Sequence, residues 1–124
     1  MSKIAEILLA EDEEHIAKLI AFKLTREGHL VTIAPNGQEA MDLLPKKEWS
    51  LVILDVMMPI ADGWTVLKKI RSLPEMNPVP VLMLTAKGFQ QDIANAADLG
   101  ATQFLKKPFD PAELAAVVKK LVTQ

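Results

Sequence analysis

Five short apolar runs, separated by longer amphipathic stretches, constrain the fold of this chain more than any other feature. The runs are Ile7 to Leu9, Leu30 to Ile33, Leu51 to Leu54, Val81 to Leu84, and Phe104 with Leu105. Each run is nearly continuous in apolar residues instead of alternating with polar ones, which is typical of parallel strands buried on both faces. The pattern therefore predicts five strands of one parallel sheet.

The stretches between the runs have helical spacing. After the first strand, Ile16, Leu19, Ile20 and Leu24 share one stripe, and Gly28 follows as a helix stop. The sequence predicts that this stripe packs against the sheet.

The next two helices have their own start signals. Asn36, with Glu39 three residues later, resembles a capping box, and Pro45 ends the helix that it opens. A third helix is predicted after Gly63, with Leu67 and Ile70 facing inward. Both helices are thus expected to cross between consecutive strands.

Two more helices complete the pattern. A weaker one is predicted from about Gln90 to Leu99, closed by Gly100. The last helix has the clearest signals, with Asp110 as N-cap and Pro111 at the first helical position. Strands and helices therefore alternate throughout, which predicts a doubly wound α/β fold with right-handed crossovers.

Length and composition limit the chain to one domain. We take residues 1–124 as a single domain, because the chain has 124 residues, half of them apolar, and no second core fits. No apolar run approaches the roughly 20 residues that span a bilayer, so we expect a cytoplasmic protein without membrane contact. The net charge of -2 argues against direct nucleic-acid binding. Proteins and small anions remain as partners.

Polar residues follow four of the five predicted strands. Glu11 and Asp12 come after the first strand, Asp55 after the third, Thr85 after the fourth and Lys107 after the fifth. In an open parallel sheet the carboxyl ends of the strands hold the ligand, so these side chains should converge. Three neighbouring carboxylates repel one another, and a hard divalent cation relieves that repulsion. The sequence predicts a metal site with open positions.

These residues belong to a longer pattern that resembles a known family. The motifs are Glu11-Asp12, Asp55-Val56-Met57-Met58-Pro59 with Asp62-Gly63, Thr85-Ala86 and Lys107-Pro108-Phe109. Together they resemble the receiver domain of two-component response regulators, over the whole chain. The resemblance implies a flavodoxin-like (βα)5 fold, a three-layer α/β/α sandwich with strand order 2-1-3-4-5.

The resemblance also implies roles for the acidic residues. Asp55 would be the phosphoacceptor. Asp12, the Asp55 carboxylate and the backbone carbonyl of Met57 would hold Mg²⁺, or alternatively Mn²⁺, and Glu11 would reach the metal through water. Glu11 stands where many family members carry aspartate, so its extra methylene could shift the metal or its water shell.

Four further residues receive roles in the same way. Lys107 and Thr85 would bind oxygens of the phosphoryl group, and Phe104 would be the aromatic switch residue. The Lys107-Pro108 bond would be cis. Lys106 is the alternative lysine, but as a neighbour on an extended segment it should point the opposite way.

The implied function is that of a switch. A sensor histidine kinase or a phosphotransfer protein would phosphorylate Asp55 in a Mg²⁺-dependent reaction. The surface of the fourth helix, fifth strand and fifth helix would then control an unidentified downstream protein. The chain would be a monomer, or a weak dimer formed through that same surface. We expect no separate enzymatic turnover, and a free-standing receiver is favoured over one cut from a longer regulator.

Three other readings stay open. An aspartyl-phosphate phosphatase usually carries a second acid two residues after the nucleophile, where this chain has Met57. A flavodoxin-like FMN domain would need a Ser/Thr/Gly-rich loop in place of the acids around Asp12. A degenerate receiver would bind partners without phosphorylation.

His15 and His29 are predicted to be solvated or capping residues, not ligands.

Overall fold

A computed structural model describes residues 4–86 and 100–123 of the chain. Its elements, in order, are β1 (Glu6–Ala10), α1 (Glu14–Arg26), β2 (Leu30–Ala34), α2 (Gly37–Leu43), the 3₁₀ helix η1 (Leu44–Lys46), β3 (Leu51–Asp55), α3 (Gly63–Ser72), β4 (Val81–Thr85), β5 (Gln103–Lys106) and α5 (Pro111–Val122). The helix predicted from Gln90 to Leu99 lies outside the described residues. None of the described helices has the length and apolar character needed to cross a bilayer.

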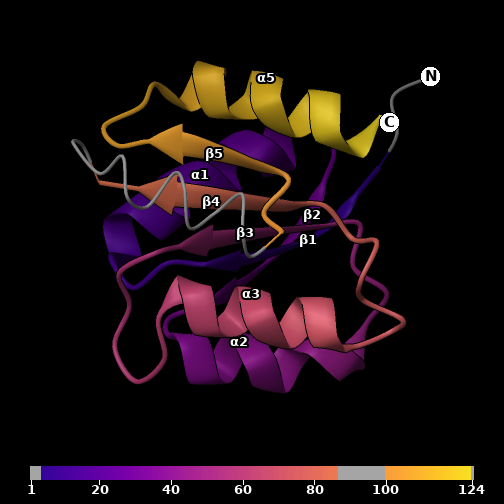
Figure 1. Cartoon of the computed structure of the whole chain (residues 1–124). Coiled ribbons are helices and arrows are strands. Elements are labelled where there is room, and N and C mark those ends of the chain that lie inside the picture. Colours follow the sequence, from indigo (N-terminus) through magenta and orange to yellow (C-terminus); the bar gives the residue numbers. More distant parts are fainter. Residues whose placement is uncertain (1–3, 87–99, 124) are drawn as a thin grey trace.

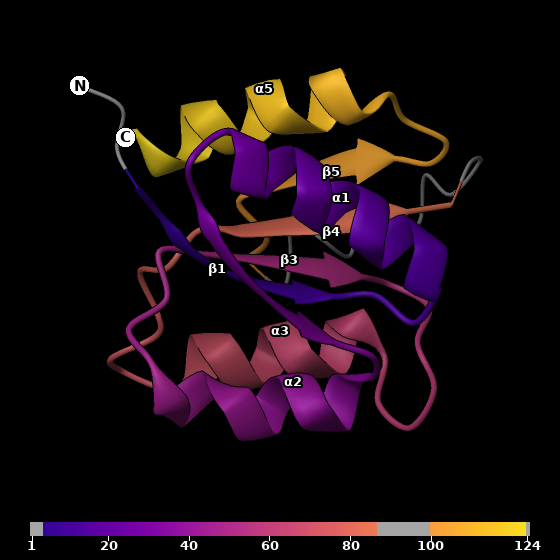
Figure 2. The same ribbon diagram turned by 180° about the vertical axis from the view of Figure 1, so that it is seen from behind.

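The five strands form one parallel sheet in the order β2-β1-β3-β4-β5. Helices α1 and α5 cover one face, and α2 and α3 cover the other (Figures 1 and 2). This arrangement confirms the three-layer, flavodoxin-like fold class. All strands point the same way, so the residues that follow them lie along one edge.

Side chains alternate between two cores along the strands. Ile7 and Leu9 of β1 pack toward α1 and α5, whereas Leu8 and Ala10 pack toward α2 and α3. Every residue of the central strands β3 and β4 is buried. Each fully buried Leu or Ile contributes about 2 kcal/mol of apolar burial. The central strands therefore form a firm base for the residues at their ends.

The prediction that all five strands are buried on both faces is wrong for the two outer strands. Leu30 and Ile33 of β2 are 57% and 38% exposed, because β2 is an edge strand that the helices cover incompletely. β5, at the other edge, has one buried residue, Leu105. Leu19 of α1, predicted to face inward, is 52% exposed and lies beside the buried stripe of that helix.

The predicted helix starts are confirmed by hydrogen bonds. The Glu39 backbone N–H donates to Asn36 Oδ1 at 2.8 Å, and Asn36 Nδ2 donates to Glu39 Oε2 at 2.9 Å, as in a capping box. The Ala112 N–H donates to Asp110 Oδ1 at 2.8 Å. α2 ends at Leu43, two residues before Pro45, and Pro45 lies inside η1, a 3₁₀ helix of three residues that follows α2 directly.

His29 has a different role from the solvated or capping one predicted. Its side chain is buried, and its Nδ1 accepts a hydrogen bond from the Ala5 backbone N–H at 3.1 Å. Burial lowers the pKa of His29 below its usual value, although Glu27 opposes this. The neutral ring is therefore a structural acceptor at the start of β1.

Candidate functional site

The carboxyl ends of the strands place the predicted site residues along one edge of the sheet. Asp55 is the last residue of β3 and Thr85 the last of β4, while Glu11 follows β1 and Lys107 follows β5. Glu11, Asp55 and Thr85 are all buried. Burial is unusual for two neighbouring acids such as Glu11 and Asp55. Such burial calls for a partner, and Lys107 is one.

Lys107 joins the acidic residues. Its Nζ donates to Glu11 Oε1 and to Asp55 Oδ2, both at 3.0 Å. The Lys107 side chain is only 20% exposed, and that of Glu11 is fully buried. Hydrogen bonds between charged groups are stronger than those between neutral ones, and Lys107 is the cation that both carboxylates share. Lys106 is exposed, so Lys107 is the lysine of this pocket.

The three carboxylates form a compact group of oxygen donors. One carboxylate oxygen from each of Glu11, Asp12 and Asp55 lies within 4.8 Å of the others. Asp12 is exposed, so the group opens to solvent on its side. Oxygen donors with one open side suit Mg²⁺, which binds to one or two carboxylates and keeps several waters. The donor set therefore fits a hard divalent cation.

The electrostatics of the pocket follow from burial. Burial raises the pKa of Glu11 from 4.5 to about 7, helped by the neighbouring Asp55 carboxylate and opposed by Lys107. Burial disfavours the charged form of Lys107, but its hydrogen bonds to Glu11 and Asp55 outweigh this and raise the pKa of Lys107. Glu11 thus exchanges a proton near neutral pH in the metal-free pocket.

The segment after β3 packs closely around the buried Asp55. The Met57 N–H donates to Asp55 Oδ1 at 3.3 Å, and the Met57 side chain is 71% exposed. A Cβ on Gly63 would overlap the Asp55 carbonyl, so only glycine lets α3 begin this close to β3. Asp62 caps α3 by accepting from the Thr65 N–H at 2.9 Å.

Ile60, which lies between Met57 and Gly63 in the sequence, has a left-handed φ of 73° and is 79% exposed. Left-handed backbone is strained for a β-branched residue. The segment between Met57 and Gly63 therefore keeps an unfavourable backbone conformation close to Asp55.

The residues predicted to sense the phosphoryl group lie on β4 and β5. Thr85 is buried, and its carbonyl accepts from the Lys107 N–H at 2.6 Å. Phe104 is 37% exposed, so it is not a fully buried strand residue. The Lys107-Pro108 peptide bond is cis. The structure thus brings Lys107 into contact with Glu11 and Asp55, and it places a carboxylate oxygen of Asp12 within 4.8 Å of one on each of these two acids.

Glu13 is a member of the pocket that the sequence did not single out. Its Oε1 lies 3.8 Å from Lys107 Nζ, and its backbone N–H donates to Glu11 Oε2 at 3.2 Å. The acidic run from residue 11 to residue 14 was the available signal. Because all four residues of this run are acidic, the sequence could not show which of them turns toward Lys107.

A doubly wound sheet with an acidic, lysine-containing pocket at its carboxyl edge defines a class of α/β domains with an anion or metal site. Residues 7–119 match the family described as the response regulator receiver domain. The chain belongs to the receiver domain family of response regulators.

Individual relatives agree with this family. The chain is 39% identical to a probable transcriptional regulator, ycf29, of Porphyra purpurea, over 94% of this chain and 56% of that protein. A putative response regulator from Chloroflexus aurantiacus has a similar structure, with a TM-score of 0.92 and 33% identity, covering 98% of this chain and all of that chain.

A third comparison concerns the metal. The receiver domain of the sensor histidine kinase PA1611 from Pseudomonas aeruginosa, described with a magnesium ion coordinated in its active-site cleft, is 29% identical, with a TM-score of 0.89, and the match covers 98% of this chain and all of that chain. The chain spans about half the length of several curated relatives that it matches. Those longer relatives carry further sequence beyond the matching region.

Proposed function

We propose that this protein is a phosphorylation-controlled switch in which Asp55 accepts a phosphoryl group in a Mg²⁺-dependent reaction. The donor is a sensor histidine kinase, a phosphotransfer protein or a small phosphodonor. The observation that carries the proposal is the contact of Lys107 Nζ with both Glu11 and Asp55 beside three clustered carboxylates.

The chemistry assigned to Asp55 is a simple displacement. One Asp55 carboxylate oxygen attacks phosphorus, the bond from phosphorus to the donor's imidazole nitrogen breaks, and the imidazole keeps the electron pair and takes up a proton. A carboxylate is a competent nucleophile for this step, and the site contributes mainly positioning and charge stabilisation. In this proposal Lys107 Nζ moves its hydrogen bond from the Asp55 carboxylate to one phosphoryl oxygen. The Thr85 hydroxyl donates a hydrogen bond to a second phosphoryl oxygen.

The charge of the pocket explains why a cation is required. The pocket gathers three carboxyl groups around one lysine, so its negative charge repels an incoming phosphoryl group. Bound Mg²⁺ would supply the missing positive charge next to the phosphoryl oxygens. Asp12 and Asp55 would hold it with the Met57 carbonyl, and Glu11 would act through water.

The output is proposed to pass through the surface that includes β5 and α5. Phosphorylation adds about -1.5 to -2 charge units at one point. Thr85 moves toward that charge, and Phe104, now 37% exposed, turns into the space that Thr85 leaves. Several relatives are called transcriptional regulators, and we propose that the partner of this switch is a protein that controls a cellular response in the cytoplasm. No separate enzymatic substrate is proposed.

Intact-mass measurement tests the proposal. Incubation of the protein with acetyl phosphate and Mg²⁺ should add one phosphoryl mass to the wild type and none to Asp55→Asn. Asp42→Asn, a matched change of an exposed acid on α2, should leave the phosphorylation intact. Omission of Mg²⁺ with a chelator should abolish it. A phosphoryl adduct that persists in Asp55→Asn would refute the assignment.

A further inference from the structure

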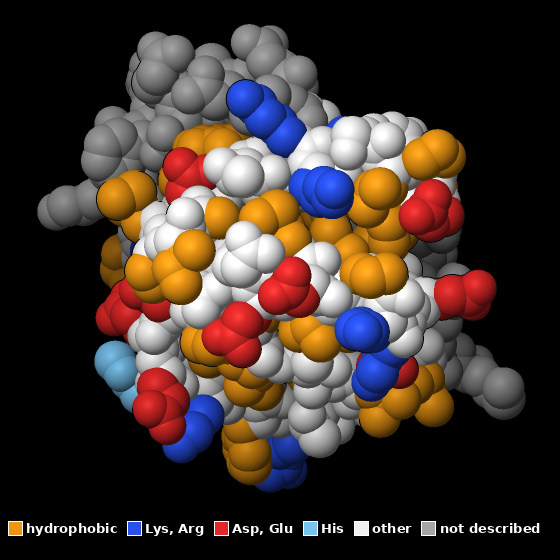
Figure 3. Space-filling model, turned by 90° about the horizontal axis from the view of Figure 1, so that it is seen from below, with side chains coloured by type: hydrophobic (Ala, Val, Ile, Leu, Met, Phe, Trp, Pro, Cys, Tyr) orange, Lys and Arg blue, Asp and Glu red, His pale blue; other side chains and the backbone are white. Residues whose placement is uncertain are grey.

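A large groove lies between α2 and α3, away from the pocket at Asp55. It has a volume of about 1200 Å³. Its lining comes from α2, η1, the segment between η1 and β3, the second half of α3 and the segment after α3: Gln38, Met41, Asp42, Leu44, Pro45, Lys46, Lys47, Glu48, Trp49, Lys69, Leu73, Glu75, Met76 and Val79. Figure 3 views this side of the molecule, where apolar side chains gather among charged ones of both signs. The groove takes no part in the chemistry described above.

The size and chemistry of the groove argue against a small ligand. Small-molecule pockets are usually about 300–1,000 Å³ and carry a few polar groups aimed at the ligand. The indole N–H of Trp49 is already used, since Nε1 donates to the Leu43 and Leu44 carbonyls at 3.2 Å. The floor includes the buried apolar side chains of Leu44, Trp49 and Met76, and the partly exposed Met41 beside them is an adaptable contact. Such a floor suits the apolar face of a helix.

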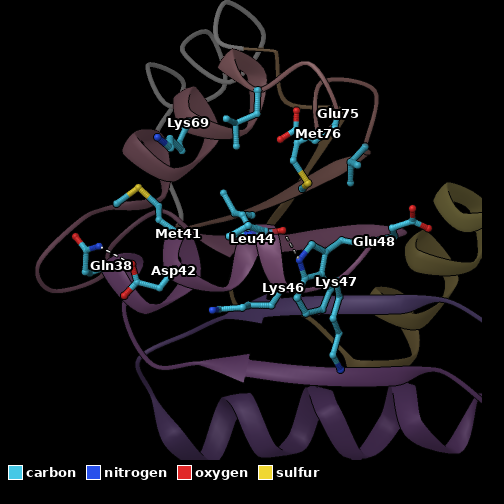
Figure 4. Close-up of a pocket in the computed structure, with 14 residues that line it drawn as sticks. Gln38, Met41, Asp42, Leu44, Lys46, Lys47, Glu48, Lys69, Glu75 and Met76 are labelled. Atoms are coloured by element: carbon cyan, nitrogen blue, oxygen red, sulfur yellow. Dashed lines mark hydrogen bonds between the residues drawn. The ribbon is translucent and has the colours of Figure 1, made fainter.

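The rim of the groove is polarised. Figure 4 shows Lys46 and Lys69 reaching toward the end where Gln38 lies and Glu48 reaching toward the opposite end, with Glu75 between Lys69 and Glu48. All four side chains are exposed, and none of them takes part in an ion pair with another described residue.

Two other charged side chains of the lining are already engaged. Lys47 binds Glu6 at 3.5 Å and lies over the Trp49 ring. Asp42, at the lysine end, accepts from Gln38 Nε2 at 3.0 Å and offsets part of the positive charge there. One end of the groove is nevertheless basic, and the other is acidic.

This polarity matches a helix in one orientation. Helices usually carry acidic residues in the first turn and basic residues in the last, in accord with the helix dipole. A partner helix with that pattern would put its acidic start on Lys46 and Lys69 and its basic end on Glu48 and Glu75. It would therefore run in the same direction as α2.

We propose that the groove between α2 and α3 is a docking site for an amphipathic helix of a partner protein, bound with its acidic N-terminal turn at Lys46 and Lys69. This site is separate from the phosphoacceptor pocket and does not depend on it. A helix of about 15 residues, about 22 Å long, is the minimal probe of such a groove.

The probe is a pair of synthetic helical peptides with the same composition. Both carry Leu and Phe at helical spacing on one face. The matched peptide has Glu in its first turn and Lys in its last, and the exchanged peptide has these charges swapped. Chemical shifts of ¹³C-labelled methionine methyls locate binding, because Met41 and Met76 line the groove whereas Met57 is exposed beside Asp55.

The matched peptide should shift the Met41 and Met76 signals, leave Met57 unchanged, and bind roughly tenfold more tightly than the exchanged peptide. In a variant combining Lys46→Glu, Lys69→Glu, Glu48→Lys and Glu75→Lys, which keeps the net charge, the preference should reverse. Each of these substitutions is at an exposed position.

Four results would overturn the proposal. One is that neither peptide binds at millimolar concentration. Another is that both bind equally in the wild type and in the charge-exchanged variant. A further one is that the Met57 signal shifts in place of those of Met41 and Met76. The last is that the Met41 and Met76 signals move with protein concentration alone, which would show that a second copy of the chain occupies the groove.

Discussion

The buried carboxyl of Glu11 should make the stability of the metal-free protein fall as the pH rises. Its pKa is raised from 4.5 to about 7 in the folded state, with burial as the main cause. Between these values the folded protein binds more protons than the unfolded chain, so stability decreases with increasing pH. Each pKa unit corresponds to about 1.4 kcal/mol, so the full effect is about 3 kcal/mol.

Glu11→Gln isolates this effect, because glutamine has nearly the shape of the protonated acid and cannot ionise. In urea unfolding with a chelator present, the variant and the wild type should have similar stability at pH 4.5. Above pH 7 the variant should be more stable by about 3 kcal/mol, which moves the urea midpoint by about 1–3 M. Against a total stability of about 5–15 kcal/mol, such a difference is readily measured.

Glu13→Gln is the matched control for this measurement. Glu13 is the next acid along the chain that faces Lys107, at 3.8 Å, but its side chain is half exposed. Solvent screens an exposed pair, so this variant should differ from the wild type by less than about 1 kcal/mol at any pH. An equal pH dependence in Glu11→Gln and the wild type would show that Glu11 keeps an ordinary pKa, and the account of the buried pocket would then fail.

Three more predictions concern stability away from the acidic pocket, each checked by urea unfolding. Ile60→Asn should stabilise the protein by about 1 kcal/mol, because asparagine tolerates the left-handed backbone and Ile60 is 79% exposed; a loss of stability would show that its side chain is needed. Gly37→Ala should destabilise by about 1–3 kcal/mol, since the new Cβ would overlap the Ala61 carbonyl, and a neutral result would mean that the segment after β3 yields easily. The pKa of His29 is lowered in the folded protein, so the unfolded chain takes up a proton more readily as the pH falls below 6.5, and the wild type should lose stability there. His29→Gln should abolish this loss of stability, and an unchanged dependence of stability on pH would contradict the explanation.

The sequence predicted the sheet and its helices because both depend on local patterns. Asn36 and Asp110 are recognisable caps whatever surrounds them, and the runs that became β3 and β4 are apolar throughout. The same reasoning could not find the edge strands. Leu30 and Ile33 look like core residues, and only the strand order, which no single run contains, leaves them on the outside.

The site was predictable as a set of residues but not as a set of contacts. Parallel strands bring their ends to one edge, so Glu11, Asp55 and Lys107 could be grouped from the sequence. Which oxygen meets Lys107 Nζ depends on side-chain rotamers and on burial, and so does the proximity of Glu13. His29 illustrates the same limit, because a turn position gave no sign that its ring would accept from Ala5.

The two proposed sites lie at different ends of α3. The helix begins at Gly63, in contact with the Asp55 backbone, and Lys69 in its second half lines the groove. A partner helix on Lys69 and Met76 would therefore leave Asp55 open to its phosphodonor. If phosphorylation moves α3 so that the groove binds the peptide with a different affinity, then by linkage the peptide must change the phosphorylation equilibrium by the same factor. If α3 stays in place, both effects vanish together, so measuring either one determines the other.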